Sequence, residues 1–369
     1  MRLKKDLKLV VIMMLCSSWW LMSCSVDDNA IEDLEYDYRT ILNSLDWGED
    51  TVFVYGHKTP DADATCSALA YAKLMRTLGY NCKAKVSGPI NRETQYIAQR
   101  FGFDVPEVKS EVMAGTRLIL TDHTDYVQCV NGAREAVILQ KIDHHVEGDI
   151  LDIMIPFVRR EMVGSTCTVV YDCYKELGVA IDDETAKILL AGLISDTRNL
   201  SKSTTCHIDS IAWTALVSQL KLEDDVDEIN RQMDEAANNY EGMTDLEIFF
   251  SDNKDYGIGG KAIGIGSMVC KAAEADVFVN RMLAVMPDVM NYNQLDMVFA
   301  MILIQVPNPD QSNPDIPYVN GVTYFIYYGE GAKEVAEALF GPSLLEGVTY
   351  TKENLSRKQI VPLMKEIIE

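Results

Sequence analysis

Three apolar, strand-like segments of this chain each lead directly into histidine and aspartate residues. The chain has five histidines, and four of them follow these segments. The segments and the residues that follow them are 51–55 with His57, Asp61 and Asp63, 116–121 with Asp122 and His123, and 135–142 with Asp143, His144 and His145. In an open parallel sheet, ligands bind at the carboxyl ends of the strands. The pattern therefore predicts a sheet that delivers imidazoles and carboxylates to one site.

Helix-like segments alternate with these strands and define the fold class. They lie at 62–78, 165–178 and 182–197, and the first is closed by Gly79, a residue that commonly stops a helix. Such alternation predicts an α/β fold, whose N-terminal domain is a mostly parallel sheet with helices on both faces. A second, smaller α/β domain is predicted after an acidic helical stretch, from strand candidates at 261–269, 295–306 and 322–329.

Length and charge limit the partners of the protein. The chain has 369 residues, which is enough for two domains with substantial cores. Its formal net charge is −23, and this opposes binding along long nucleic acid, where affinity comes mainly from neutralising phosphates. A small phosphate ligand stays compatible, because metals and a few local cations can hold it. The nine cysteines are scattered without a CxxC pair, so neither a disulfide framework nor a zinc knuckle is predicted.

The N-terminus is typical of an export signal. Four basic residues precede a short apolar run at 9–15, which is too short to span a membrane. The sequence Leu21-Met22-Ser23-Cys24 resembles a bacterial lipoprotein cleavage box. We therefore expect a signal peptide at 1–23, lipidation of Cys24, an acidic tether at 24–50, and an exported protein held at a membrane only by its lipid. The alternatives are a plain signal peptide, an anchor that is never cut, or a cytoplasmic protein with an unprocessed N-terminus.

The candidate ligands combine imidazoles with carboxylates and include no thiolate. Asp196, at the end of an apolar helical pattern, adds a further carboxylate. Such a set suits Mn²⁺, Fe²⁺, Co²⁺ or Zn²⁺ better than Ca²⁺ or copper. The stretch from Asp61 begins like a calcium-binding loop but lacks that loop's later glycine and glutamate. At least six candidate ligands favour two metals, which can share a bridging water, lower its pKa and clamp a phosphoryl group.

These motifs resemble the DHH phosphoesterase superfamily, through Asp143-His144-His145. The segment at 56–75 is similar to the first motif of manganese-dependent (family II) inorganic pyrophosphatases, and "LTDHT", "KIDHH", "GSTCTVVY" and "LLAGLISDT" follow in that family's order. The segments at 252–266 and 355–364 resemble the DHHA2 domain that these pyrophosphatases share with short-chain exopolyphosphatases. The resemblance implies a DHH domain at 51–220, a linker at 221–241 and a DHHA2-like domain at 242–369, with the active site in the cleft between them.

The resemblance also implies a role for each motif residue. The expected activity is hydrolysis of pyrophosphate to two phosphates with two divalent metals, Mn²⁺ or Co²⁺, and with Mg²⁺ accompanying the substrate. It further implies a homodimer formed through the edge of the first sheet. The implied roles are His57 and Asp61 on the first metal, Asp63, His144 and Asp196 on the second, Asp122 as the catalytic bridge, His145 as a catalytic and substrate-binding residue, and Lys254, Arg357 and Lys358 as phosphate-binding cations.

The chain departs from the pyrophosphatase pattern at three places near the expected substrate. The family usually has Asp-His-Asn-Glu where this chain has residues 122–125, and two lysines after the Ser-Arg where it has Lys358-Gln359. The segment "RNLSKSTT", at 198–205, is one residue longer than the usual form. These departures leave the metal ligands intact.

Three other functions are compatible with parts of the pattern. The first is an exopolyphosphatase acting on short polyphosphates with the same metals. The second is a nano-RNase or phosphoadenosine-phosphate phosphatase, although that type has a Gly-Gly-Gly-His motif where "GIGG" is followed here by Lys261. The third is a non-catalytic lipoprotein that binds phosphate or metal, which would have no need of six ligands.

Overall fold

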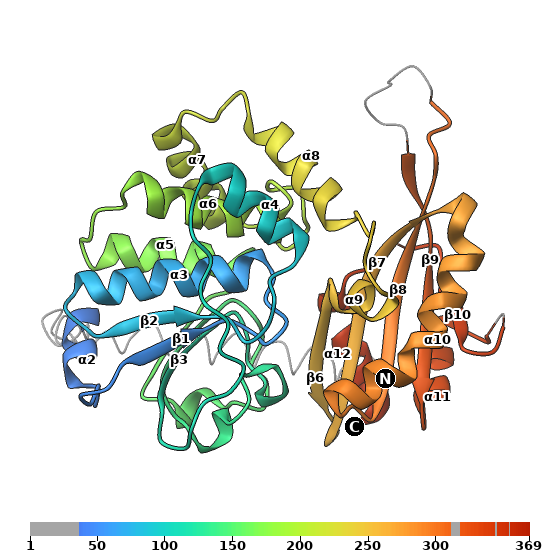
Figure 1. Ribbon diagram of the computed structural model, residues 1–369, viewed down its shortest axis with the longest axis horizontal. Coiled ribbons are helices and arrows are strands. Elements are labelled where there is room, and N and C mark those ends of the chain that lie inside the picture. The colour runs from blue at the N-terminus through green and yellow to red at the C-terminus, as the bar shows by residue number, and fades with distance from the viewer. Residues whose placement is uncertain (1–36, 311–317, 344, 354) are drawn as a thin grey trace, which may run out of the picture. The chain divides into compact units, whose positions relative to one another are not determined.

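The computed structural model describes residues 37–310, 318–343, 345–353 and 355–369 (Figure 1). The chain divides into two compact units, Met1–Leu45 and Asp46–Glu369. In the first unit the described part is helix α2 (Tyr38–Ser44), which is capped by Asp37. The expected signal peptide and Cys24 lie outside the described residues. Among the helices that are described, none combines the length and the hydropathy of a membrane span.

The second unit begins with a five-stranded parallel sheet. Its strand order is β2-β1-β3-β4-β5, and all four neighbouring pairs are parallel. The strands are β1 (Val52–Tyr55), β2 (Cys82–Lys85), β3 (Arg117–Thr121), β4 (Val137–Asp143) and β5 (Phe157–Arg160). Strands β1, β3 and β4 are the three segments predicted from the sequence, and they are neighbours. Their carboxyl ends therefore meet at one edge of the sheet.

Helices and short 3₁₀ turns cover the two faces of this sheet. Figure 1 shows the α-helices gathered over one face. They are α3 (Ala62–Thr77), α4 (Arg92–Phe101), α5 (Thr166–Glu176), α6 (Asp183–Thr197), α7 (His207–Leu220) and α8 (Val226–Ala237). On the opposite face Leu118 and Leu120 of β3 pack against Val130 and Ile150, in a segment with 3₁₀ helices at Tyr126–Gln128, Ala133–Glu135 and Asp152–Met154. The predicted α/β class is confirmed.

The second sheet of this unit is mixed. Its strand order is β10-β9-β8-β7-β6, and only β7 and β8 run parallel. The strands are β6 (Asn253–Ile258), β7 (Lys261–Lys271), β8 (Met297–Pro307), β9 (Tyr318–Gly329) and β10 (Val348–Thr351). One apolar cluster joins α9 (Asp245–Phe250) and α10 (Ala275–Asn293) to one face of this sheet. A second apolar cluster joins α11 (Ala332–Phe340) and α12 (Arg357–Ile368) to the other face. A 3₁₀ helix at Ala272–Glu274 precedes α10.

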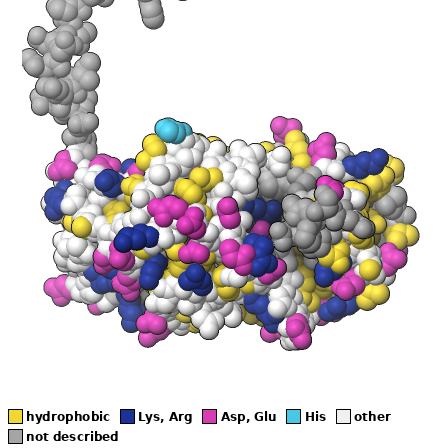
Figure 2. Space-filling model, turned by 90° about the horizontal axis from the view of Figure 1, so that it is seen from above, with side chains coloured by type: hydrophobic (Ala, Val, Ile, Leu, Met, Phe, Trp, Pro, Cys, Tyr) yellow, Lys and Arg dark blue, Asp and Glu magenta, His cyan; other side chains and the backbone are white. Residues whose placement is uncertain are grey.

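The surface mixes both signs of charge. On the face shown in Figure 2, the described Lys and Arg side chains are interspersed with Asp and Glu and form no continuous basic stripe. A basic stripe is the usual electrostatic feature of a surface that follows nucleic acid. The clustered chemistry of the chain lies instead at the carboxyl edge of the parallel sheet.

Candidate metal centre

The loop after β1 brings His57 and Asp61 to the carboxyl edge of the sheet. A Cβ at Gly56 would lie 2.5 Å from the carbonyl oxygen of Ala64, so glycine is required for this close approach. Asp61 is the N-cap of α3, and its Oδ1 accepts a hydrogen bond from the Ala64 amide at 2.9 Å. Its Oδ2 lies 3.1 Å from Nε2 of the buried His57. One carboxylate therefore starts the helix and also faces a candidate ligand.

Asp63, in the first turn of α3, is held by the N-terminus of α5. It accepts hydrogen bonds from the Ser165 hydroxyl at 2.7 Å and from the Thr166 and Cys167 amides at 2.6 and 3.0 Å. Amides at a helix N-terminus stabilise negative charge. Burial, and after it the nearby Asp196 carboxylate, still raises the pKa of Asp63 to about 6. The hydrogen bonds to Asp63 therefore do not fully offset the burial of its charge and the repulsion from the neighbouring carboxylate.

Asp122, directly after β3, lies between two histidines. Its backbone is left-handed, with φ 62°, a conformation that is uncommon for non-glycine residues and that occurs repeatedly at active sites. Its Oδ1 accepts a hydrogen bond from the Thr166 hydroxyl at 2.8 Å and lies 3.4 Å from Nε2 of His144. Its Oδ2 lies 3.6 Å from Nε2 of His57. The two oxygens of one carboxylate thus face ligands from different loops.

His144, directly after β4, presents an unprotonated ring nitrogen to the site. Its Nδ1 lies 3.0 Å from the carbonyl oxygen of Val163, and because a carbonyl only accepts, Nδ1 carries the proton. Its unprotonated Nε2 can bind a cation. This atom lies 3.2 Å from Oδ2 of Asp196 and 3.4 Å from Nζ of Lys358. Burial, and after it the ammonium of Lys358, lowers the pKa of His144 well below the usual value. The ring is therefore neutral, as a metal ligand must be.

His145 is oriented by the first residue of the Asp-His-His motif. Its Nδ1 lies 2.9 Å from Oδ1 of the buried Asp143. Burial disfavours ionisation of Asp143, but the neighbouring histidines, His145 above all, hold the pKa of its carboxyl below the ordinary range. A carboxylate behind an imidazole fixes the orientation of the ring. The sequence analysis placed Asp143 at this edge but gave it no individual role, and its place beside the two histidines is the signal that could have indicated one.

All six predicted metal ligands come together at this edge. Together with His145 they form three overlapping groups, and within each group the nitrogen and oxygen atoms lie within 4.8 Å of one another. The groups are His57, Asp61 and Asp122; Asp122, His144 and His145; and Asp63, His144 and Asp196. Asp122 and His144 each belong to two of these groups. The two oxygens of the Asp122 carboxylate face His57 and His144, which is the arrangement expected of a bridging ligand.

The buried polar atoms of the site fit divalent cations. Both ring nitrogens of His57 and Oδ2 of Asp122 are buried without a hydrogen-bond partner among the described residues, and such atoms are costly unless paired. Burial, and after it the carboxylate of Asp63, raises the pKa of Asp122 well above the usual value. Neutral imidazoles and crowded carboxylates are the ligand set of first-row divalent metals. The residues present therefore fit a metal centre.

Three predicted cations reach this site from the second sheet. Nζ of Lys254, on β6, lies 3.1 Å from Oδ2 of Asp61. Nζ of Lys358, on α12, lies 3.4 Å from Oδ2 of Asp196. Burial disfavours the charged form of Lys254, but Asp61 and other site carboxylates outweigh it and raise the pKa of this ammonium. Arg357 donates to the carbonyl and carboxylate oxygens of Asp252, so its guanidinium is held in place on its own domain.

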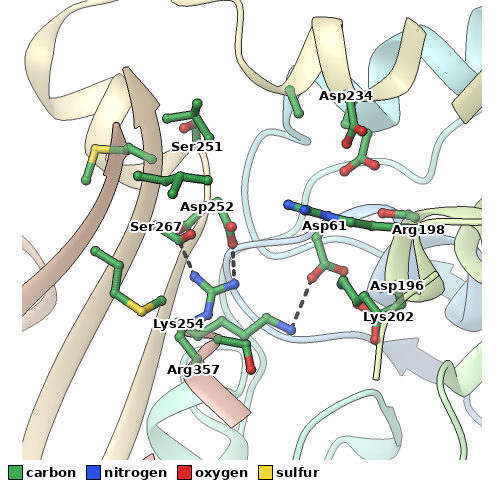
Figure 3. A pocket seen from close by; sticks show the side chains of 18 of the residues that line it. Asp61, Asp196, Arg198, Lys202, Asp234, Ser251, Asp252, Lys254, Ser267 and Arg357 are labelled. Atoms are coloured by element: carbon green, nitrogen blue, oxygen red, sulfur yellow. Dashed lines mark hydrogen bonds and ion pairs between the residues drawn. The ribbon is translucent and has the colours of Figure 1, made fainter. Parts of the chain in front are cut away.

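A pocket of about 440 Å³ opens beside the candidate ligands. Both sheets contribute to it, and Figure 3 shows Asp61, Asp196 and Arg198 opposite Asp252 and Arg357. Lys202, which was not predicted, also lines it, with Nζ 3.7 Å from Oδ1 of Asp196. Lys202 belongs to the segment 198–205, which is one residue longer than the usual form, and this difference could have indicated a role at the site.

His123 follows β3 like the site histidines but does not join them. Its Nδ1 lies 2.8 Å from the carbonyl oxygen of Thr121, and its Nε2 lies 3.2 Å from Sγ of Cys129. Burial lowers its pKa to about 4. Its position at a strand end therefore reflects a neutral, hydrogen-bonded core residue and not a ligand.

Replacing Thr166 with valine is expected to weaken Mn²⁺ binding by about 10–100-fold, because the variant removes the hydroxyl that orients Asp122. Isothermal titration calorimetry measures this affinity directly. Thr168→Val is the matched control, since the Thr168 hydroxyl binds Asp209 and no candidate ligand. The control should lose stability by about 1 kcal/mol and keep its Mn²⁺ affinity. Equal affinities in the two variants would refute the orienting role.

The fold and the site together define a two-domain α/β protein with a candidate metal centre at the carboxyl edge of its parallel sheet. The model of the DHH family, N-terminal domain, matches residues 51–193. The DHHA2 domain model matches residues 231–367. The chain belongs to the DHH family, in the form that also carries a DHHA2 domain.

Named relatives agree with the resemblance seen in the motifs. A Methanothrix thermoacetophila protein named manganese-dependent inorganic pyrophosphatase is 32% identical over 316 residues, covering 85% of this chain and 97% of the relative. A Clostridium acetobutylicum protein named "Probable manganese-dependent inorganic pyrophosphatase" is 30% identical, with 87% and 99% covered. A Methanococcus jannaschii crystal structure titled "putative family II inorganic pyrophosphatase" has a TM-score of 0.70 at 24% identity, covering 85% of this chain and 98% of that one. This similarity confirms the fold.

Proposed function

We propose that the protein is a manganese-dependent inorganic pyrophosphatase, which hydrolyses pyrophosphate to two phosphates at a centre of two divalent cations. The observation that carries the proposal is Asp122, whose two carboxylate oxygens face His57 and His144 in different ligand groups. The names of the relatives, over nearly their whole lengths, support the same activity. His57 and Asp61 would hold one cation, Asp63, His144 and Asp196 the other, and Asp122 both.

The remaining site residues supply charge, orientation and a proton. When bound, the cations lower the pKa of water and polarise phosphoryl oxygens. Lys254 and Lys358 compensate the negative charge of the substrate, which a strongly acidic protein must do locally. His145 has Nδ1 committed to Asp143, so its Nε2 is the atom available to hydrogen-bond a phosphate oxygen or to give it a proton. The Arg357 guanidinium, held by Asp252, provides a planar donor at the pocket wall.

A phosphate-release assay with added metal tests the proposal. The full chain is stripped with chelator, reconstituted with Mn²⁺, Co²⁺ or Mg²⁺, and given pyrophosphate. We expect turnover that depends on the metal and is fastest with Mn²⁺ or Co²⁺. Phosphoadenosine phosphate and short dinucleotides are the comparison substrates for the nano-RNase type. Metal binding without release of phosphate from pyrophosphate would favour a binding lipoprotein and defeat the proposal.

We also propose that the protein is exported and anchored by a lipid on Cys24. The basic residues, short apolar run and Leu-Met-Ser-Cys sequence support this. The wild-type protein should fractionate with membranes and incorporate labelled palmitate, whereas Cys24→Ser should incorporate none. Soluble cytoplasmic protein that retains its first residues would contradict the proposal. The location is independent of the activity, so the wild-type protein and Cys24→Ser should both hydrolyse pyrophosphate.

A further inference from the structure

The loop between β1 and α3 contacts the second sheet through residues that are not candidate metal ligands. Nζ of Lys58, the residue after His57, lies 2.8 Å from Oδ2 of Asp255 on β6. The next residue, Thr59, donates its hydroxyl to the carbonyl oxygen of Asn253 at 2.6 Å. The loop that brings ligands to the metal centre therefore also joins the domain of the parallel sheet to β6.

Strand β6 receives these contacts as an edge strand. It is the last strand of the second sheet, and an edge strand leaves backbone groups without a partner strand. The carbonyl oxygen of Asp255 accepts a hydrogen bond from Nε2 of Gln128 at 2.7 Å. The carbonyl oxygen of Gln128 in turn accepts the amide of Lys58, also at 2.7 Å. The first domain thus holds β6 at the residues on both sides of Lys254.

The two partners of the ion pair are unequally buried. The side chain of Asp255 is 0% exposed, and that of Lys58 is 21% exposed. Asp255 also accepts hydrogen bonds from Nδ2 of Asn253 and of Asn293, both at 2.8 Å. Among the described residues, Lys58 is the cation that lies within 4.0 Å of this carboxylate. A buried carboxylate needs a compensating charge as well as hydrogen bonds, so Lys58 is what allows Asp255 to stay charged at this contact.

Lys254 lies between the two residues of β6 that are held. Successive side chains of a strand point to opposite faces, so Lys254 projects away from Asp255. Its Nζ lies 3.1 Å from Oδ2 of Asp61, as the dashed line in Figure 3 shows. Asp61 and Lys58 belong to the same loop. One loop therefore holds β6 at Asp255 and meets the Lys254 ammonium at Asp61.

We propose, on the basis of the pyrophosphatase function above, that Lys58 is a positioning residue that acts through Lys254. Its ion pair with Asp255 fixes β6 against the loop that carries His57 and Asp61, and so holds the Lys254 ammonium beside the candidate metal centre. A displacement of about 1 Å at a substrate-binding group is enough to slow a reaction strongly. Pyrophosphate bound by both the metal centre and Lys254 favours the same arrangement, so the ion pair matters most before substrate binds.

The test removes each partner of the ion pair and then both. Lys58→Met leaves the Asp255 carboxylate buried without a counter-charge, whereas Asp255→Asn leaves an ammonium that can turn toward water. In phosphate-release assays with Mn²⁺, Lys58→Met should raise KM for pyrophosphate about tenfold and change kcat less than about threefold, because saturating substrate restores the arrangement. Asp255→Asn should have a smaller effect. The double variant should recover most of the lost kcat/KM, since it leaves no buried charge unpaired.

Two further measurements separate positioning from a general loss of structure. Isothermal titration calorimetry should give Lys58→Met an Mn²⁺ affinity within about twofold of wild type, because the Lys58 side chain has no hydrogen bond or ion pair to a candidate ligand among the described residues. In the Lys254→Met background, Lys58→Met should lower kcat/KM less than about twofold further, because the two residues act as a unit.

Lys73→Met is the matched control. Nζ of Lys73 pairs with Asp182 and Glu184 within the first domain, and its side chain is 25% exposed, close to the value for Lys58. The control should keep wild-type kcat and KM, because its ion pairs do not reach β6. If Lys58→Met does not fold, Asp255→Asn takes its place in the comparison with Lys254→Met.

Three results would overturn this inference and leave the proposed function standing. The first is a wild-type KM in Lys58→Met. The second is a loss in Lys58→Met that the added Asp255→Asn does not reduce. The third is an undiminished loss when Lys58→Met is added to Lys254→Met. Failure of the wild-type protein to hydrolyse pyrophosphate with Mn²⁺ would instead overturn the proposed function itself.

Discussion

Replacing Asp122 with asparagine is expected to lower kcat/KM for pyrophosphate on the order of 10³-fold. The variant keeps the shape of the side chain but removes the charge that two ligand groups share. A metal ion supplies several kcal/mol of charge stabilisation in the transition state, and each 1.4 kcal/mol is about tenfold in rate. The same variant should bind Mn²⁺ more weakly, and calorimetry measures that without any turnover. Phosphate release with saturating Mn²⁺ measures the rate.

Asp182→Asn is the control for this substitution. Asp182 caps α6 through the Thr185 amide, and asparagine is an equally good cap, so activity and Mn²⁺ affinity should stay unchanged. The thermal midpoint of each variant, with and without Mn²⁺, separates loss of metal from loss of fold, because a ligand of the native state raises the midpoint. Wild-type turnover and affinity in Asp122→Asn would contradict the bridging role.

Replacing Lys254 with methionine is expected to lower kcat/KM for pyrophosphate about 10²-fold or more, an effect similar to the loss of one preorganised donor. Methionine keeps the apolar stem and removes the ammonium, which lies 3.1 Å from Oδ2 of Asp61. The site carboxylates keep this lysine charged despite its burial, so the charge is present for a phosphate ligand at any ordinary pH. Steady-state kinetics with Mn²⁺ measures the loss.

Metal binding distinguishes this variant from Asp122→Asn. Lys254→Met removes a positive charge next to the candidate ligands and should leave Mn²⁺ affinity equal or higher. Lys261→Met, at the start of the adjacent strand β7 and outside the pocket lining, is the matched control and should behave as wild type. A Lys254→Met enzyme with unchanged kinetics would exclude Lys254 from substrate binding.

The metal centre was predictable because its residues follow strands. The strands before His57, Asp122 and His144 are apolar and short, and parallel strands place their carboxyl ends together. Local patterns were therefore enough to bring these residues to one edge. The short strand β2, the edge strands β6 and β10 and helix α4 were not predicted. Strand preference depends strongly on tertiary neighbours and is weak in short segments.

The roles of individual side chains were less predictable. His123 and His144 occupy the same kind of position after neighbouring strands, yet His123 bonds the backbone of Thr121 while His144 faces Asp196. The difference lies in the direction of each ring, which contacts with distant residues decide. The support of Asp63 by Ser165 likewise joins residues far apart in sequence, and no local pattern encodes it.

The sequence by itself determined the class of fold, the family and the edge at which histidines and aspartates gather, because the alternation of strands and helices, the strand ends and the motif order can be recognised along the chain. Only the tertiary structure decided which atoms converge, that Asp122 faces both His57 and His144, and that Lys58 pairs with Asp255. The physical reason is that ligand geometry and the pairing of charges depend on contacts between elements far apart in the chain. Those contacts exist only after the sheet, the helix N-termini and the second domain have packed around the site.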